Sequence, residues 1–349
     1  MRTSFRLLAL VASAVAALAL AGGALAVPKL IISSAPAAPT VVQVTEEKTD
    51  AAPLMIRIYI PKEFTASLTQ PAGTQIGTVH ADLQALAISP DAIINADGQV
   101  LTDTPAKFVA NTCAPGVHPA VLVLHVTVSG QTIDVPVYVD APLSGAEAAL
   151  GAAKLTLCLS NPYEQAAPGT RAPFGVKIIN AKMSLDAGVI SPPASGESHW
   201  TSLITPWTIN GATPNAAGTV EARAIVRVPA TLTLGAKVKT KKKGRKVANS
   251  VLLSGKLLEA LQGVQGGSVT ILAGGKSIGT AKTSSTGAFS KSLGLKKKTT
   301  FQARAVVPQR DVTAAGCAGA SAAPGGCVSA TLAGYTLTSN RFTAVPKKK

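Results

Sequence analysis

Apolar and polar residues alternate along much of the chain, and this pattern predicts strands rather than helices. From Leu54 to Ile60 every second residue is Leu or Ile, as in a strand with one buried face. A clear hairpin runs from Pro119 to Val139 and turns at Ser129-Gly130. The best helical candidate, Gly145 to Ala153, is short and contains an internal glycine. We therefore expect an all-β protein.

The strongest alternation lies between Ser250 and Val307. Val269 and Ile271 alternate with Ser and Thr, and Gly274-Gly275 can adopt the positive φ angles of a two-residue hairpin turn. Alternation resumes toward Val307. We interpret the whole segment as one antiparallel meander, with the basic hairpin of residues 238–247 before it.

Glycines and apolar residues recur here in the order G-x-L, G-x-V-x-I-L, Gly-Gly and T-x-x-x-G-x-F. The residues are Gly255, Leu257, Gly267, Val269, Ile271, Gly274, Gly275, Thr283, Gly287 and Phe289. This order resembles that of bacterial Ig-like and carboxypeptidase-regulatory-like domains, over roughly Ala230 to Val345. The resemblance implies a β-sandwich that serves as a spacer, display module or adhesive unit. It carries over no functional residues, because that family has no shared active site.

Charge divides the chain into two parts with different surface chemistry. Residues 27–229 hold 11 Lys and Arg against 15 Asp and Glu, whereas residues 230–349 hold 20 against 2. We expect two β-sandwich domains, residues 54–229 and residues 230–349, the second being Ig-like and ending in a Lys-rich tail. Val328 to Leu337 and Asn340 to Val345 should complete the second sandwich. The Ala/Pro-rich residues 27–53 should form a flexible leader, although Thr40 to Thr45 could instead pair as an edge strand.

The first 26 residues have the pattern of a secretory signal peptide. Arg2 and Arg6 precede an apolar run, and small residues end at Ala26, where we expect cleavage. An uncleaved anchor is the competing interpretation, because Leu7 to Ala26 is about long enough to span a bilayer. The expected location is secreted and extracellular, with association to the cell envelope as a further expectation.

Because an exported protein meets an oxidising environment, we expect the four cysteines to form disulfides. Three pairings are available. We favour Cys113 with Cys158 and Cys317 with Cys327, because each pair then stays inside one expected domain.

The first part is also similar to secreted modules built as cell-surface sandwiches. This likeness implies an extracellular location and a Cys113–Cys158 pair, and nothing about chemistry. It rests on Cys113, His118, Val135 to Asp140, Cys158, Thr205-Pro206-Trp207 and Pro214-Asn215.

Residue spacing gives no support for catalysis or for a bound cofactor. No nucleophile with an acid–base pair can be assembled from the sequence, and neither cysteine pair has the spacing of a zinc site. The sequence Asn95 to Gly98 should be an ordinary turn, because the calcium-loop spacing is missing. The four histidines, His80, His118, His125 and His199, are scattered and should be surface or partly buried residues. We therefore expect a non-enzyme without metal or cofactor.

Aromatic residues make up only 4% of the chain, which leaves few rings for stacking on a sugar. Trp200 and Trp207, with Tyr163, are the only candidates for such a site. A core position is the favoured interpretation, because each Trp would bury a large share of the available apolar area.

Runs of lysine and arginine are the largest chemical signal in the sequence. The candidate polyanion-binding residues are Lys241, Lys242, Lys243, Arg245, Lys246, Lys296, Lys297 and Lys298. A solvated surface without a ligand is the competing interpretation. Aromatic residues are not interleaved with these runs, which disfavours specific binding of nucleic acid.

We expect a secreted structural or adhesive protein that docks to anionic cell-envelope polymers or to another surface protein. An extracellular carbohydrate- or protein-binding module is the alternative.

Overall fold

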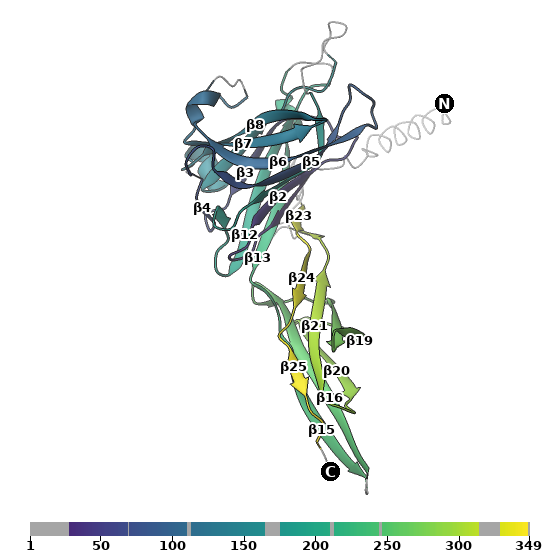
Figure 1. Ribbon diagram of the computed structural model, residues 1–349. Helices are drawn as coiled ribbons and strands as arrows, with labels where there is room; N and C mark the ends of the chain where they lie inside the picture. The colour runs from purple at the N-terminus through teal and green to yellow at the C-terminus, as the bar shows by residue number, and fades with distance from the viewer. Residues whose placement is uncertain are drawn as a thin grey trace, which may run out of the picture.

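The computed structural model describes residues 28–68, 70–109, 113–164, 175–209, 213–243, 246–313 and 329–347. Within these ranges the chain is almost wholly strand and loop (Figure 1), which confirms the prediction of an all-β fold. The helical elements described are the short 3-10 helices η1 (Pro105–Phe108), η2 (Gly145–Ala149) and η3 (Ala216–Gly218).

Thirteen strands form one large sheet, the first sheet, in the order β1-β2-β10-β5-β6-β7-β8-β9-β3-β12-β13-β23-β22. Their bounds are β1 (Lys29–Ser33), β2 (Thr40–Thr45), β3 (Pro53–Ile60), β5 (Gln75–Gln84), β6 (Ile93–Asp103), β7 (Ala120–Val128), β8 (Gln131–Asp140), β9 (Ala153–Cys158), β10 (Lys177–Leu185), β12 (Gly196–Pro206), β13 (Val220–Val228), β22 (Arg310–Thr313) and β23 (Ser329–Leu332). Two short strands, β4 (Thr65–Ala66) and β11 (Ile190–Ser191), pair beside it.

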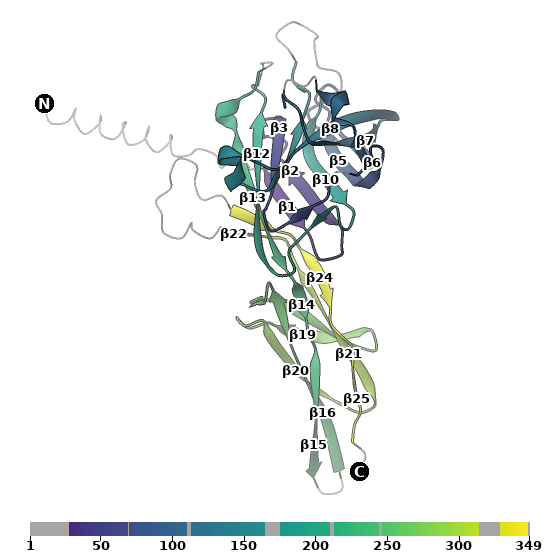
Figure 2. The same ribbon diagram turned by 90° about the vertical axis from the view of Figure 1, so that its left-hand side faces the viewer.

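The first sheet curls back on itself and buries its inner face. β1 stands at one end of the hydrogen-bonding order, yet it packs against β13 and β23 near the other end (Figure 2). The enclosed core consists mainly of Val, Ile and Leu, with Trp200 as its largest side chain. The predicted hairpin is confirmed as β7 and β8, and Ser129 and Gly130 both have positive φ in its turn.

The flexible leader expected over residues 27–53 is wrong for the residues described. β1 and β2 lie in that stretch, and β2 is hydrogen-bonded to β1 on one side and β10 on the other. Leu30, Ile32, Val42 and Val44 enter the core of the first sheet. The Ala and Pro residues that suggested disorder lie between these strands, where they form the connecting turn.

Two other local predictions are wrong, because contacts with distant segments determine the backbone conformation at both places. The helix predicted from Gly145 to Ala153 is present only as the short 3-10 helix η2, Gly145–Ala149. At Gly151 an added Cβ would collide with the backbone of Ile60. The turn expected at Asn95 to Gly98 is an interior part of β6. There Gly98 lies so close to the backbone of His125 that any side chain would collide with it.

Two smaller sheets extend from the first sheet as a narrow second part (Figures 1 and 2) and enclose a separate core. The β16 sheet contains β14 (Ala230–Leu232), β15 (Gly235–Lys243), β16 (Lys246–Glu259), β17 (Gln262–Gly263) and β20 (Ala288–Gly294). The β21 sheet contains β18 (Ser268–Ala273), β19 (Lys276–Lys282), β21 (Thr299–Val307), β24 (Tyr335–Thr338) and β25 (Phe342–Ala344). Layered sheets of this kind are consistent with a β-sandwich.

The predicted strands and hairpins of this part are present, but they do not form one meander. β18 pairs with β19 and β21, whereas β20 pairs with β16 in the opposite sheet. The chain changes sheet in the turn before β20, where Gly287 has φ +73°. A side chain at Gly287 would collide with the backbone of Leu257, so only glycine allows this close crossing.

After β21 the chain returns to the first sheet before it completes the second part. β22 and β23 pair with each other, and β23 lies parallel to β13. The expectation that Val328 to Leu337 completes the second sandwich is therefore wrong for β23 and holds only for β24. Ala330 and Leu332 bury an apolar patch on β13 around Ile225, which explains the return.

A buried carboxylate occupies the junction between the two parts. Glu259, 3% exposed, accepts hydrogen bonds from Arg310 Nη2 and Tyr335 Oη, both at 2.5 Å. Arg227 Nη1 lies 3.7 Å from the same carboxylate. Burial, with the hydrogen bond to Glu259, raises the pKa of the Tyr335 phenol. Because these partners come from β22, β24 and β13, one side chain connects both parts.

We predict that Glu259→Gln lowers the free energy of unfolding by about 3 kcal/mol, because it leaves the half-buried guanidinium groups of Arg227 and Arg310 without this buried carboxylate. Urea unfolding at neutral pH measures the change. Glu221→Gln is the matched control, since Glu221 pairs with Arg223 at a more exposed position and should cost at most about 1 kcal/mol. Equal losses for the two variants would contradict the prediction.

A second buried acid lies just after β2. Glu46 is 5% exposed, and neither carboxylate oxygen has a hydrogen-bond partner among the described residues. Burial raises the pKa of Glu46 to about 8, although the positive charge of Lys177 acts in the opposite direction. Lys177 is itself buried and donates to the carbonyl oxygens of Glu47 and Asp50, each at 2.5 Å.

The pKa of Glu46 predicts a pH-dependent stability. The folded protein keeps a proton that the unfolded chain releases near pH 4.5, so this stabilisation is full below pH 4.5 and is lost as the pH rises to about 8. Glu46→Gln removes the titration, so its unfolding free energy relative to wild type should rise by about 4 kcal/mol between pH 4.5 and pH 8. Urea unfolding across this range tests it, with Glu47→Gln as the exposed control. A constant difference between wild type and Glu46→Gln would refute the assignment.

Candidate functional site

Three basic runs that are far apart in the sequence meet at the free end of the second part. They are the described residues of the β15–β16 hairpin, the loop of residues 295–298 between β20 and β21, and residues 345–347 after β25, which we call the tail. Figure 1 shows this hairpin and the C-terminus together at the end farthest from the first sheet. We call these three segments the basic end.

Asn249 on β16 connects the three segments. Its side-chain oxygen accepts a hydrogen bond from Thr240 Oγ1 on β15 at 2.9 Å. Its side-chain nitrogen donates to the carbonyl oxygen of Lys347 in the tail at 3.1 Å. Its backbone carbonyl accepts from the N–H of Leu295, which begins the loop, at 2.8 Å. Sequence reasoning missed Asn249, and a polar residue within an apolar strand is the one signal that could have indicated it.

Most of the predicted polyanion-binding residues lie at the basic end and are exposed. Lys241 and Lys242 are on β15, and Lys296, Lys297 and Lys298 fill the loop before β21. Lys243 and Lys246 face each other in the strand register of the hairpin. Arg245 lies outside the described residues.

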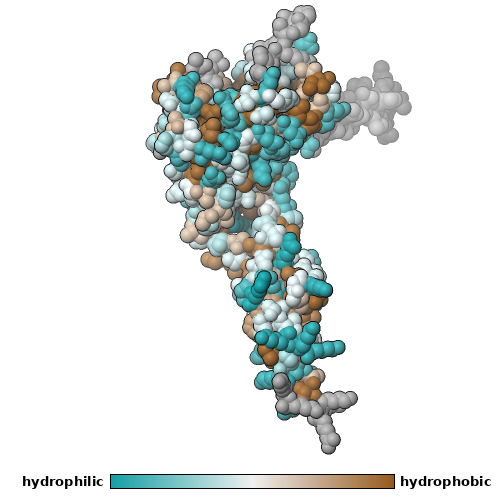
Figure 3. Space-filling view, in the orientation of Figure 1, coloured by the Kyte–Doolittle hydropathy of each residue, from teal (hydrophilic) through white to brown (hydrophobic). Residues whose placement is uncertain are grey.

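No aspartate or glutamate side chain lies at the described part of the basic end. Glu259 and Asp311 are the only acids of residues 230–349, and both lie at the junction, where Asp311 pairs with Lys29 at 2.7 Å. Among the described residues, the lysines from Lys237 onward form no ion pair. Hydrophilic side chains project from the narrow second part in Figure 3. An excess of like charge at one end produces a positive potential that attracts polyanions.

The tryptophans do not form a sugar-binding platform. Trp200 is completely buried and packs edge-on against Phe64, with 5.0 Å between ring centroids. The stacking role considered for Trp200 is therefore wrong, and the favoured core interpretation is correct for it. Trp207 is half-buried and donates its indole N–H to the carbonyl oxygen of Leu159 at 3.3 Å, while the Tyr163 hydroxyl accepts from the N–H of Ala52.

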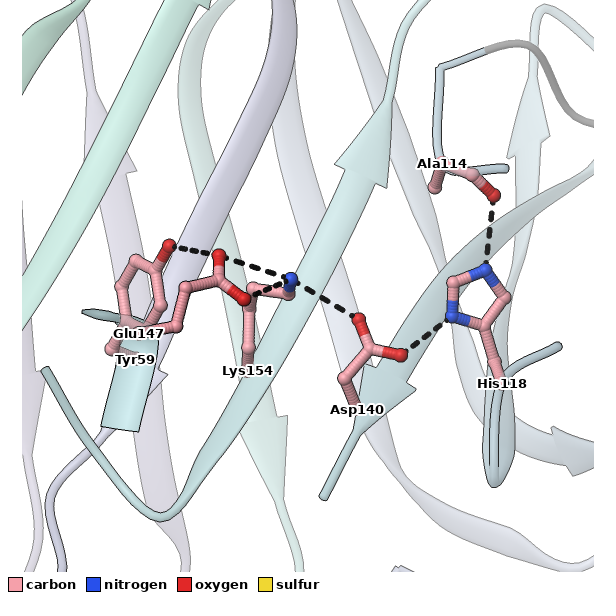
Figure 4. Close-up of polar contacts among 6 residues, drawn as sticks. All are labelled: Tyr59, Ala114, His118, Asp140, Glu147 and Lys154. Atoms are coloured by element: carbon pink, nitrogen blue, oxygen red, sulfur yellow. Dashed lines mark hydrogen bonds and ion pairs between the residues drawn. The ribbon is translucent and has the colours of Figure 1, made fainter. Parts of the chain in front are cut away.

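A chain of polar contacts on the outer face of β3, β8 and β9 is another cluster of titratable groups (Figure 4). Lys154 Nζ lies 2.8 Å from Glu147 Oε2 and 3.3 Å from Asp140 Oδ2. Tyr59 Oη donates to Glu147 at 2.8 Å, and His118 Nδ1 lies 2.7 Å from Asp140. Burial raises the pKa of Tyr59 to about 12. Burial would also raise the pKa of Glu147, but hydrogen bonds from Lys154 and Tyr59 outweigh it and lower that pKa.

Both ring nitrogens of His118 have partners within the protein. His118 Nε2 lies 3.0 Å from the carbonyl oxygen of Ala114, so both ring nitrogens face acceptors and neither offers a lone pair to a substrate. The ring is 8% exposed and packs against Tyr138. His80, His125 and His199 each lie within 3.1 Å of a carboxylate as well. A general base needs a nitrogen free to reach the substrate, which His118 lacks.

A disulfide joins the loop that precedes β7, which contains Ala114 and His118, to the end of β9. Cys113 and Cys158 are bonded as predicted, with their Cα atoms 6.1 Å apart. The predicted Cys317–Cys327 pair lies outside the described residues.

Comparisons with protein-family models, with curated proteins and with solved structures found no match. Within the described ranges, no group of three or more His, Cys, Asp or Glu side chains could hold a metal ion. The same part of the chain has no helix long and apolar enough to cross a membrane.

We predict that Lys154→Met lowers the free energy of unfolding by about 3 kcal/mol, because Glu147 and Asp140 would lose a partner that is only 15% exposed. Thermal or urea unfolding measures the loss. Lys107→Met is the control, since Lys107 pairs with Asp103 while 62% exposed and should cost at most about 1 kcal/mol. A loss for Lys154→Met as small as the control's would show that the network contributes little to stability.

Proposed function

We propose that the protein is an exported, non-catalytic structural or adhesive module of the cell envelope that attaches to anionic envelope polymers through its basic end. One observation carries this proposal: Asn249 gathers three basic runs at one end of the molecule, with both acids of residues 230–349 held at the opposite end of the second part. We further propose that the second part is an Ig-like sandwich and that residues 1–26 direct export.

Electrostatics explains why this arrangement favours a polymer over a small anion. Exposed charges are screened within about 8 Å at physiological ionic strength, so a single lysine binds a single anion weakly. Several lysines held near one another can each contact a charge of the same polymer, and the released counterions then add to the affinity. Attachment of this kind needs many contacts and no deep pocket.

The shape of the molecule supports a display or adhesive role. The basic end and the first sheet lie at opposite ends of an elongated molecule (Figures 1 and 2), so attachment at one leaves the other exposed. The burial of Trp200 removes the main support for the alternative of a carbohydrate-binding module.

Sedimentation of the exported chain with purified anionic envelope polymer, across a salt series, tests the proposal. Wild type should bind at low salt and dissociate as the salt concentration rises. The variant in which Lys242, Lys296, Lys297 and Lys298 are all changed to Gln should bind about tenfold more weakly at low salt, with a shallower salt dependence.

The matched control changes four exposed lysines of the first part to Gln, namely Lys48, Lys62, Lys107 and Lys182. It loses the same net charge and should bind nearly as well as wild type. Absence of wild-type binding at low salt, or equal weakening of the two variants, would refute attachment through the basic end.

A further inference from the structure

Lysines form a regular row on one face of β15. Lys237, Lys239 and Lys241 are exposed, while Val238 and Thr240 between them are half-buried. Side chains two residues apart on a strand point to the same face, so the three ammonium groups lie on one side of the sheet. That side faces away from the second core, since Val251 and Leu253 of the neighbouring β16 point inward.

Beside this row the outward face is nearly free of large side chains. Ala248, Ser250 and Leu252 on β16 stand opposite Lys241, Lys239 and Lys237. Gly294 and Ser292 on β20 stand opposite Ser250 and Leu252, and Ser290 stands opposite Ser254. Leu252 is half-buried and is the largest residue among these floor positions. The result is a floor of mainly small side chains, half of them serine, with lysines along one side.

The row continues beyond Lys237 into a shallow hollow. Lys256, on the same face of β16, lines a hollow of about 730 Å³ together with Lys282 and the hydroxyl-bearing residues Ser254, Thr283, Ser284 and Ser290. Its carbonyl oxygen accepts from the N–H of Thr233, which places Lys256 four residues further along the line of β15 than Lys237. At about 3.4 Å per residue, cations therefore stand at about 0, 7, 14 and 27 Å along the strand direction.

This spacing matches the repeat of a linear phosphodiester. Two peptide residues contain six backbone bonds and extend about 7 Å. A polymer of a three-carbon polyol joined by phosphates also has six bonds per repeat, so its extended chain has about the same pitch. Such a chain lying along β15 would present one phosphate to each lysine of the row.

We propose that the outward face of β15, β16 and β20 is the binding surface for an extended polyol-phosphate polymer, which runs along the row Lys241, Lys239, Lys237 and ends at Lys256. This inference rests on the proposed function, since it names the anionic polymer and its path. Nucleic acid strands have the same six-bond repeat, but their bases are normally bound by aromatic stacking. The outward positions described on β15, β16 and β20 carry no aromatic side chain.

The test measures binding of the exported chain to synthetic poly(glycerol phosphate) oligomers with two, five and eight phosphates. Affinity should rise steeply from two to five phosphates and little beyond, because the row spans about 27 Å, or four repeats. Oligothymidylates of equal length should bind more weakly.

Two matched variants locate the surface. Changing Lys237, Lys239 and Lys256 to Gln should weaken binding of the five-phosphate oligomer about 30-fold at low salt and make the slope of log K against log salt about 2 less negative. Changing Lys276, Arg304 and Arg341 to Gln removes three exposed cations carried by the β21 sheet and its loops, and should change the affinity less than threefold. Circular dichroism confirms that both variants fold.

The outcomes separate this inference from the proposed function. If wild type binds no anionic polymer, the proposed function fails and this inference fails with it. If wild type binds and the two variants weaken binding equally, the function stands but the row is not the surface. Tighter binding of oligothymidylate would overturn the choice of polymer. Unchanged binding with new self-association of the row variant would show that the lysines only protect the edge strand.

Discussion

The buried carboxylate of Glu259 is the interaction on which the arrangement of the two parts depends. Removing a carboxylate from water costs several kcal/mol, and the cost is recovered only when its partners surround it with good geometry. Arg310, Tyr335 and Arg227 provide those partners from three different strands. The carboxylate is therefore satisfied only when β13, β22 and β24 all meet the end of β16. This requirement selects one docking of the second part on the first sheet.

The return of the chain into the first sheet follows from the same junction. Arg310 begins β22, so the contact with Glu259 also sets where that strand lies. β23 then pairs parallel to β13, and Leu332 buries part of the outer face of that strand. A covalent linker alone would leave the two parts free to move. Shared strands and a shared buried charge connect them more rigidly.

Alternation of apolar and polar residues predicted most strands, because every strand that covers a core needs one apolar face. It failed where the partner of a strand mattered more than its own pattern. β1 and β2 were mistaken for a leader because Ala and Pro fill the turn between them, and burial of Leu30 and Val44 against distant strands is invisible locally. The basic runs were visible in the sequence, but their meeting at Asn249 depends on the hydrogen bonds that this residue makes with Leu295 and Lys347, which belong to distant segments.

Because Glu259 and Asp311 lie at the junction, the lysines of the second part keep their positive charges without a neighbouring carboxylate. If Glu259 and Asp311 stood among them, each would neutralise a neighbour and interrupt the positive surface. Lysine also suits this surface better than arginine would. Its ammonium group is a compact point charge on a flexible stem, which can follow a moving phosphate without the fixed geometry that a guanidinium requires. A lysine on an edge strand also hinders pairing with another sheet, and one or two would suffice for that purpose. Protection of the edge does not require a regular row, nor a floor of mainly small side chains beside it, whereas the proposed polymer, which must approach the sheet closely, needs both.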